Sequence, residues 1–142
     1  MKIGILGGSF DPAHKGHLAI SKEAKKRFKL EKIIWAVTKK NPLKAESKTP
    51  ISKKIKDCKK IIGLNSFIKV KFYENIIKSN KTIDLINYLK KSKNIEIFFL
   101  MGADNLVSFH KWHKSELISQ KCNIVVFDRH GYKKNSLKSK TF

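Results

Sequence analysis

The sequence predicts an α/β fold in which a parallel β-sheet of about five strands is covered by helices on both faces. Short runs rich in β-branched and aromatic residues recur along the chain, and segments of helix length and helical spacing separate them. Several of these runs are apolar at nearly every position, which is typical of strands buried on both faces. Strands that alternate with helices form right-handed βαβ units, and such units produce a parallel sheet.

The expected strands occupy residues 2–6, 32–37, 68–73, 95–101 and 122–127. The segments between them carry apolar residues at helical spacing, namely Ile20, Ala24 and Phe28, a weaker stretch from Ile55, and Ile83, Ile86 and Leu89. Pro42 and Pro50 frame a polar segment that we interpret as a loop. A length of 142 residues fits one domain.

Two unusual loops are expected to meet at one edge of this sheet. Ligands of such sheets bind beyond the carboxyl ends of the strands, where the winding direction reverses. With the expected strand order 3-2-1-4-5, this crevice lies between the first and the fourth strand. The stretch GGSFDPAHKGH (7–17) follows the first strand, and GADNL (102–106) follows the fourth. We therefore expect the functional site at this crevice.

The chain is strongly basic, with 32 Lys and Arg residues against 11 Asp and Glu residues and a formal net charge of +21. Such an excess is typical of nucleic-acid binding. The lysines are scattered over every segment, however, and arginine occurs only at Arg27 and Arg129. We therefore do not expect nucleic acid as the main partner, and a nucleic-acid-binding module is the last alternative. A positive field also favours anionic ligands such as ATP.

Membrane association is not expected from the sequence. The longest apolar runs, such as IFFLM (97–101), are too short to span a bilayer, and the N-terminus lacks the pattern of a signal peptide. Cys58 and Cys122 are isolated and form neither a C-x-x-C motif nor a disulfide framework. These features predict a protein of the reducing cytoplasm.

The stretch after the first strand combines a turn suited to phosphate with two histidines. Gly7 and Gly8 allow backbone conformations closed to other residues and let a ligand approach the main chain. A helix that begins near Gly16 would point its first N–H groups at the same spot, which favours an anion. His14 and His17 can donate from imidazole nitrogens to phosphate oxygens as charge develops there. The spacing fits neither G-x-G-x-x-G nor the P-loop motif.

Five stretches carry a resemblance to a known family. GGSFDPAHKGH matches the H-x-G-H-type signature of the nucleotidyltransferase superfamily, and in detail it resembles bacterial nicotinate-nucleotide adenylyltransferases. The other stretches follow in the order of that family: NPLK (41–44), KTIDLINYL (81–89), FFLMGADNLVSFHKWH (98–113) and VVFDRHGY (125–132). The stretch 81–89 keeps Thr82 and Asp84 of the family pattern but lacks its tyrosine. The resemblance implies a Rossmann-like sheet.

The family reaction transfers AMP from ATP to nicotinate mononucleotide, giving nicotinate adenine dinucleotide for NAD biosynthesis and releasing pyrophosphate. The resemblance implies that the mononucleotide phosphate attacks the α-phosphorus of ATP directly. An anionic nucleophile needs no general base, so catalysis would rest on positioning and charge stabilisation. The resemblance assigns the catalytic role to His14 and His17, and it implies Mg²⁺ carried by the ATP phosphates.

The resemblance also assigns residues to nucleotide binding: Gly7, Gly8, Ser9, Phe10, Lys44, Thr82, Gly102, Asp104, Trp112 and Arg129. Several of them have structural interpretations as well. Asp104 and Thr82 could cap helices, and Trp112 could be half-buried packing rather than a stacking partner of the pyridine ring. His110 and His113 have ligand-like spacing, but no third candidate lies nearby, so we expect no metal bound by the protein itself.

The sequence departs from the family pattern in two places. The family continues into an I-S-S-T-x-I-R block that grips the β- and γ-phosphates, whereas this chain closes with KKNSLKSKTF (133–142). ISKKIKDCKKI (51–61) has only lysines where the family has S-x-x-x-R. We expect a nucleotidyltransferase domain over 1–132 that lacks its C-terminal portion, and a disordered basic tail over 133–142.

Two alternative functions follow from these departures. One is a catalytically impaired remnant that binds the mononucleotide without turnover. The other is adenylyl transfer to a different phosphate acceptor, such as phosphopantetheine. The sequence leaves open whether the chain forms a homo-oligomer and whether it prefers nicotinate over nicotinamide.

Overall fold

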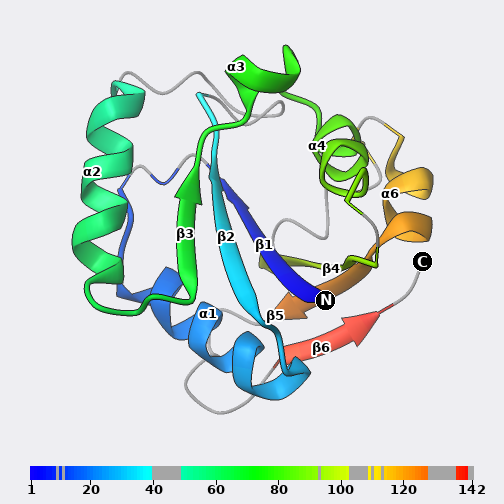
Figure 1. Ribbon diagram of the computed structural model, residues 1–142, viewed down its shortest axis with the longest axis horizontal. Coiled ribbons are helices and arrows are strands. Elements are labelled where there is room, and N and C mark those ends of the chain that lie inside the picture. Colours follow the sequence, from blue (N-terminus) through cyan, green and yellow to red (C-terminus); the bar gives the residue numbers. More distant parts are fainter. Residues whose placement is uncertain are drawn as a thin grey trace.

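A β-sheet forms the middle layer of the computed structural model, and helices cover both of its faces (Figure 1). The structure describes the chain except residues 9, 11, 40–48, 93, 103–108, 110, 113, 128–136 and 141–142, and it describes 137–140 by backbone alone. The strand order is β3-β2-β1-β4-β5-β6. The strands are β1 (Lys2–Gly8), β2 (Lys32–Val37), β3 (Ile68–Lys71), β4 (Glu96–Gly102), β5 (Asn123–Phe127) and β6 (Leu137–Lys140).

The five strands expected from the sequence are confirmed, and so is their order 3-2-1-4-5. Each neighbouring pair among them runs parallel. The observed bounds differ from the expected ones by a few residues, most clearly at β3, which ends at Lys71 because the chain turns into a short helix. The Rossmann-like architecture predicted by the alternation of strands and helices is therefore correct.

The helices divide between the two faces according to which buried cluster they complete. On one face, α1 (Lys15–Phe28) and α2 (Ile51–Ile62) pack against the sheet through Ile20, Ala24, Cys58 and Ile62. On the other face, α4 (Thr82–Leu89) and α6 (Ser115–Lys121) do so through Ile83, Ile86 and Ile118. The short helix α3 (Glu74–Ile77) connects β3 to α4.

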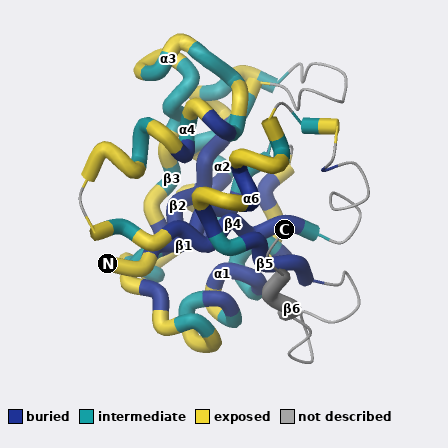
Figure 2. The backbone as a smooth tube through the Cα atoms, turned by 90° about the vertical axis from the view of Figure 1, so that its right-hand side faces the viewer, coloured by how far each residue is buried: buried dark blue, intermediate teal, exposed yellow. Residues whose placement is uncertain are grey.

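Side chains of the central strands alternate strictly between the two faces. Leu6 of β1 and Trp35 of β2 belong to the cluster under α1 and α2, whereas Ile5 and Ile34 belong to the cluster under α4 and α6. Successive side chains of a strand point to opposite faces, so an apolar run buried on both sides fills both clusters. Figure 2 shows the result, with buried residues concentrated in the central strands and exposed residues on the outer sides of the helices.

The strand β6 was not expected from the sequence. It pairs antiparallel with β5, with Phe127 opposite Leu137 and Ile124 opposite Lys140. It lies within the segment 133–142 that the sequence predicts to be disordered. Lysine and serine disfavour a buried strand, but an edge strand needs only backbone hydrogen bonds to one neighbour, and composition does not report those.

The described residues contain no helix that is both long enough and apolar enough to cross a membrane.

Candidate active site

The candidate site lies beyond the carboxyl ends of β1 and β4, which are neighbours in the sheet. β1 ends at Gly8 and β4 at Gly102, and the pairing of Leu6 with Leu100 makes the two ends level. The winding direction reverses here, because β2 and β3 lie on one side and β5 and β6 on the other. The backbone N–H of Thr38, just after β2, donates to the Gly8 carbonyl at 3.0 Å and secures this end of β1.

The two histidines of the H-x-G-H motif form the cap of α1. His14 is the N-cap residue, and its Nδ1 atom accepts a hydrogen bond from the Gly16 N–H at 3.0 Å. The Nδ1 atom of His17 accepts from the His14 N–H at 3.1 Å, so the two residues cap the helix reciprocally. The Gly16 amide, which we expected to be available to an anion at this helix start, is therefore occupied by the His14 ring.

This capping fixes which ring nitrogens can serve a ligand. A neutral imidazole has one acceptor and one donor nitrogen, so a ring whose Nδ1 accepts carries its proton on Nε2. Among the residues that the structure describes, neither His14 Nε2 nor His17 Nε2 has a hydrogen-bond partner. The start of α1 thus presents two imidazole N–H donors.

The surroundings of His17 keep its ring neutral. The pKa of His17 is lowered from its ordinary value of 6.5 to about 4, mainly by burial and next by the nearby His14. His14 lies on the exposed side of the pair, and the centroids of the two rings are 4.0 Å apart. At neutral pH His17 is therefore a neutral hydrogen-bond donor.

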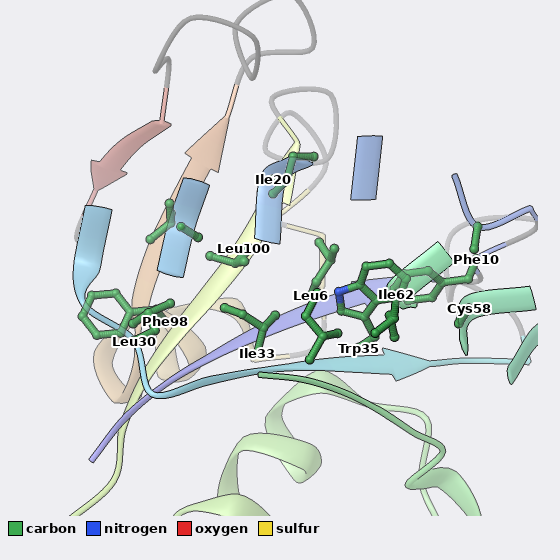
Figure 3. Close-up of a cluster of buried hydrophobic side chains, with 14 of the residues drawn as sticks. Leu6, Phe10, Ile20, Leu30, Ile33, Trp35, Cys58, Ile62, Phe98 and Leu100 are labelled. Carbon is green, nitrogen blue, oxygen red and sulfur yellow. The ribbon is translucent and has the colours of Figure 1, made fainter. Parts of the chain in front are cut away.

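The His17 ring continues into a column of aromatic side chains that reaches the core. Phe10 contacts His17 at a centroid distance of 4.7 Å, and it stacks on Trp35 at 5.2 Å with only 18° between the ring planes. Phe10 is 3% exposed and Trp35 is fully buried. Figure 3 shows Phe10 beside Trp35 at one end of the cluster beneath α1 and α2.

Among the described residues of this turn, the left-handed one is Phe10 rather than a glycine. Phe10 has φ 50°, whereas Gly7 and Gly8 belong to β1 and have no positive φ. A left-handed backbone costs a non-glycine residue roughly 1–2 kcal/mol, which burial of the phenyl ring offsets. The conformational freedom that we expected the two glycines to supply is therefore not used, and their remaining advantage is close approach to the main chain.

Aromatic residues of β4 and of the segment after it lie on the other face of the sheet, in the cluster beneath α4 and α6. Trp112 is half-buried and contacts Phe99 edge-to-face at 5.8 Å and Phe109 at 5.3 Å. Phe99 also borders the end of β1, since a Cβ at Gly7 would lie 3.5 Å from its ring. Phe99 therefore connects Gly7 with Trp112, and Trp112 has the packing role considered for it while part of its surface stays exposed.

Thr82 is the first residue of α4 and is not its cap. The N-cap residue is Lys81, whose side chain makes no capping hydrogen bond, so the interpretation of Thr82 as a helix cap is wrong. The preceding turn is held by Ser79, whose hydroxyl donates to the Asp84 carboxylate at 2.6 Å and accepts from the Lys81 N–H. No hydrogen bond or ring contact among the described residues joins Thr82 to the histidine pair.

Four residues assigned from the resemblance lie outside the described residues: Ser9, Lys44, Asp104 and Arg129. His110 and His113, which have ligand-like spacing, also lie outside them. Their assignments remain predictions. Of the described candidates, the structure gathers Gly7, Gly8, Phe10, His14 and His17 at the end of β1, with Gly102 level with them on β4.

A polar cluster beside the site was missed by sequence reasoning. Lys54 of α2 is 1% exposed, and its ammonium donates to the carbonyls of Thr38 at 3.0 Å and Lys39 at 3.4 Å. The Lys39 N–H in turn donates to Glu74 at 3.3 Å, and burial raises the pKa of the Glu74 carboxyl. Lys54 falls on the buried stripe with Cys58 and Ile62, and this helical spacing was the available signal.

The described residues offer no ready-made metal site. No group of three His, Cys, Asp or Glu side chains gathers among them.

Comparison with known proteins identifies the family. Residues 5–141 match the family model described as cytidylyltransferase-like. The chain belongs to the cytidylyltransferase-like family.

A probable nicotinate-nucleotide adenylyltransferase of Pelagibacter ubique (strain HTCC1062) is 67% identical over 141 residues, covering 99% of this chain and 78% of that protein. One from Bradyrhizobium sp. (strain ORS 278) is 37% identical, covering 91% of this chain and 68% of that protein. Within the family, the chain thus belongs with the nicotinate-nucleotide adenylyltransferases.

Solved structures of this group share the fold. The nicotinic acid mononucleotide adenylyltransferase of Plasmodium falciparum complexed with NaAD superposes with a TM-score of 0.77 at 21% identity. The match covers 92% of this chain and 66% of that one. A structure of the same enzyme complexed with APC gives a TM-score of 0.75 at 20% identity. This cytidylyltransferase-like chain therefore has the sheet of those enzymes and spans about two thirds of their length.

Proposed function

We propose that this chain transfers AMP from ATP to nicotinate mononucleotide, giving nicotinate adenine dinucleotide and pyrophosphate. The observation that carries the proposal is the histidine pair at the start of α1. Both rings accept at Nδ1 and present an Nε2 donor beside the level ends of β1 and β4. The 67% identity to the Pelagibacter protein supports the choice of acceptor.

The proposed chemistry is a single displacement at the α-phosphorus of ATP. An oxygen of the mononucleotide phosphate forms a bond to that phosphorus, and the bond from phosphorus to the bridging oxygen of the β-phosphate breaks. The electron pair leaves with pyrophosphate. Because the attacking oxygen is already anionic, no side chain has to remove a proton. The chain contributes position and stabilisation of the negative charge that develops on the α-phosphate.

His14 and His17 supply this stabilisation through their Nε2–H groups. A neutral donor held in a partly buried place is already oriented before charge develops, so little reorganisation is needed during the reaction. The low pKa of His17 supports this assignment, because a neutral ring keeps its Nδ1 acceptor bond and thereby its orientation at neutral pH. Magnesium carried by the triphosphate would supply neutralisation of charge on the leaving pyrophosphate.

The remaining assignments are part of the same proposal. We propose that Trp112 stacks on the pyridine ring with the surface that Phe99 and Phe109 leave uncovered, and that Thr82, at the start of α4, contacts a nucleotide. The residues proposed to contact nucleotides are Gly7, Gly8, Ser9, Phe10, Lys44, Thr82, Gly102, Asp104, Trp112 and Arg129. We propose the cytoplasm as the location, which the free thiols of Cys58 and Cys122 support.

A pyrophosphate-release assay tests the proposal. Purified chain is given ATP and Mg²⁺ with nicotinate mononucleotide, nicotinamide mononucleotide or phosphopantetheine in parallel. We expect the highest kcat/KM with nicotinate mononucleotide. Faster turnover with phosphopantetheine would replace the proposed acceptor. Binding of nicotinate mononucleotide without pyrophosphate release would identify an impaired remnant.

A further inference from the structure

Two buried polar side chains connect the backbone of His17 to the middle of the sheet. Ser21 lies one helical turn after His17 in α1, and its hydroxyl donates to the His17 carbonyl at 2.8 Å. The indole N–H of Trp35, in β2, donates to the same hydroxyl oxygen at 2.8 Å. Neither Ser21 nor Trp35 has exposed surface. The three groups form one continuous hydrogen-bonded chain from β2 to the first turn of α1.

The ring of His17 is tied to the same tryptophan by a second route. Phe10 lies between them in contact with both, and the His17 and Trp35 rings also approach each other directly, with centroids 5.7 Å apart at 57°. Trp35 itself is fixed by its strand, because it pairs with Leu6 of β1 (Figure 3). The backbone and the imidazole of His17 therefore share one rigid support.

Stability alone does not explain this pair. A serine inside a helix that bonds the carbonyl four residues earlier slightly destabilises the helix. A buried indole N–H must find a partner or cost free energy. Apolar residues at both positions would leave no polar atom to satisfy, and replacing both partners of a buried hydrogen bond is nearly neutral for stability. What the polar pair adds is a defined position for the His17 carbonyl.

We propose that Ser21, held by Trp35, is a positioning residue that fixes the first turn of α1 and so aims the Nε2–H of His17 at the transferring phosphate. The inference rests on the proposed function, which gives His17 its role. Ser21 is fully buried and acts through His17. Misplacement of a reacting group by about 1 Å can reduce the rate about 100-fold. Loss of the hydrogen bond from Ser21 to the His17 carbonyl should therefore lower kcat.

The test uses four variants of the full chain: S21A, W35F, S21A/W35F and the control S119A. Ser119 is a matched control because it is 3% exposed and its hydroxyl also lies within hydrogen-bond distance of carbonyls of the preceding helical turn, that of Glu116 at 2.9 Å and that of Ser115 at 3.2 Å. It lies in α6, on the opposite face of the sheet. For each variant, kcat and both KM values, the melting temperature and the pH titration of the His17 ring by NMR are measured.

We expect the loss of melting temperature caused by S21A to depend on Trp35, and the loss of kcat not to depend on it. S21A leaves the indole N–H without its partner, so it lowers the melting temperature more in the wild-type chain than in the W35F background. S21A lowers kcat by about 10-fold to 100-fold in both backgrounds, with KM changed much less. W35F keeps the bond from Ser21 to His17 and loses less of kcat. S21A also moves the His17 pKa from about 4 toward 6.5, because the ring is held less firmly in its buried place.

The control and a fifth variant decide what a failure means. S119A should leave kcat and the His17 titration unchanged. If S21A matches S119A in kcat and in the titration, or if its kcat recovers in the W35F background together with stability, the positioning role is overturned. H17A tests the proposed function separately. Full activity of H17A would reject the catalytic assignment, and the titration of His17 in S21A would then still decide whether Ser21 holds that ring.

Discussion

His17 has a pKa of about 4, well below the ordinary value of 6.5, and this difference links its burial to stability. Between those two values the unfolded chain binds more protons than the folded chain, because only the unfolded histidine is protonated there. Burial of neutral His17 therefore contributes fully to the free energy of unfolding above about pH 6.5. This contribution is lost as the pH falls toward 4.

We expect the urea midpoint to fall as the pH is lowered from 6.5 to 4, and an H17Q variant to lose part of this dependence. The two chains differ only at residue 17, so the difference between wild type and H17Q isolates His17. The measurement is urea unfolding at several pH values between 4 and 7.5. An identical pH dependence in both chains would show that the ring is not buried as described.

Lys53 and Lys54 are adjacent in α2 but have opposite surroundings. The side chain of Lys53 is 63% exposed and pairs with Asp57 at 3.0 Å, whereas Lys54 is buried with its ammonium on two carbonyls. We expect K54M to lower the free energy of unfolding by about 1–3 kcal/mol, because buried acceptors lose their donor. K53M should change it by less than about 0.5 kcal/mol. Denaturant unfolding of both variants checks this, and equal losses would contradict it.

Replacement of Trp112 should affect the binding of the two substrates differently. If its exposed surface stacks on the pyridine ring, W112A should weaken binding of nicotinate mononucleotide by about 10-fold, a loss typical of one aromatic stack, and leave ATP binding nearly unchanged. Calorimetric titration of each ligand alone measures this. Equal losses for both ligands would mean that Trp112 acts only by packing against Phe99 and Phe109.

At the scale of elements, His14 at the start of α1 has two roles, capping the helix and donating to a phosphate, and one substitution can distinguish them. His14 caps the helix through Nδ1, and an asparagine side chain can accept the same hydrogen bond from the Gly16 N–H. We expect H14A to lose about 1 kcal/mol of stability and H14N to regain most of it. Neither variant should regain the rate, because both lack the Nε2 donor. Thermal unfolding and kcat measured together check this, and recovery of kcat in H14N would reduce His14 to a cap.

Elements and their ends were predictable to different degrees. The strands could be predicted because apolar runs such as that of β4 are buried on both faces, and the position of α1 followed from its apolar spacing. The reciprocal cap could not, because His14 and His17 accept at Nδ1 only once the helix start is formed. Nor could the positive φ of Phe10, which depends on the place for its ring beside Trp35.

At the scale of the whole molecule, the strand order was predictable and the support of the site was not. The alternation of strands and helices allows few topologies. The two loops with candidate functional residues, 7–17 and 102–106, fit the topology in which the first and fourth strands are neighbours. Lys54 shows the opposite case. Its helical spacing with Cys58 and Ile62 signals burial, but only packing against the end of β2 supplies the two carbonyls that its ammonium binds.

The central claim is that the whole sheet serves to place an imidazole donor of His17 at a phosphate in the β1–β4 crevice. The direct measurement is kcat for AMP transfer to nicotinate mononucleotide by the wild-type chain and H17A, with melting temperatures recorded for both. The account predicts a fall in kcat of about 100-fold to 1,000-fold, as for loss of one donor to a developing oxyanion, in a variant that remains folded. A folded H17A that keeps the wild-type kcat would contradict it.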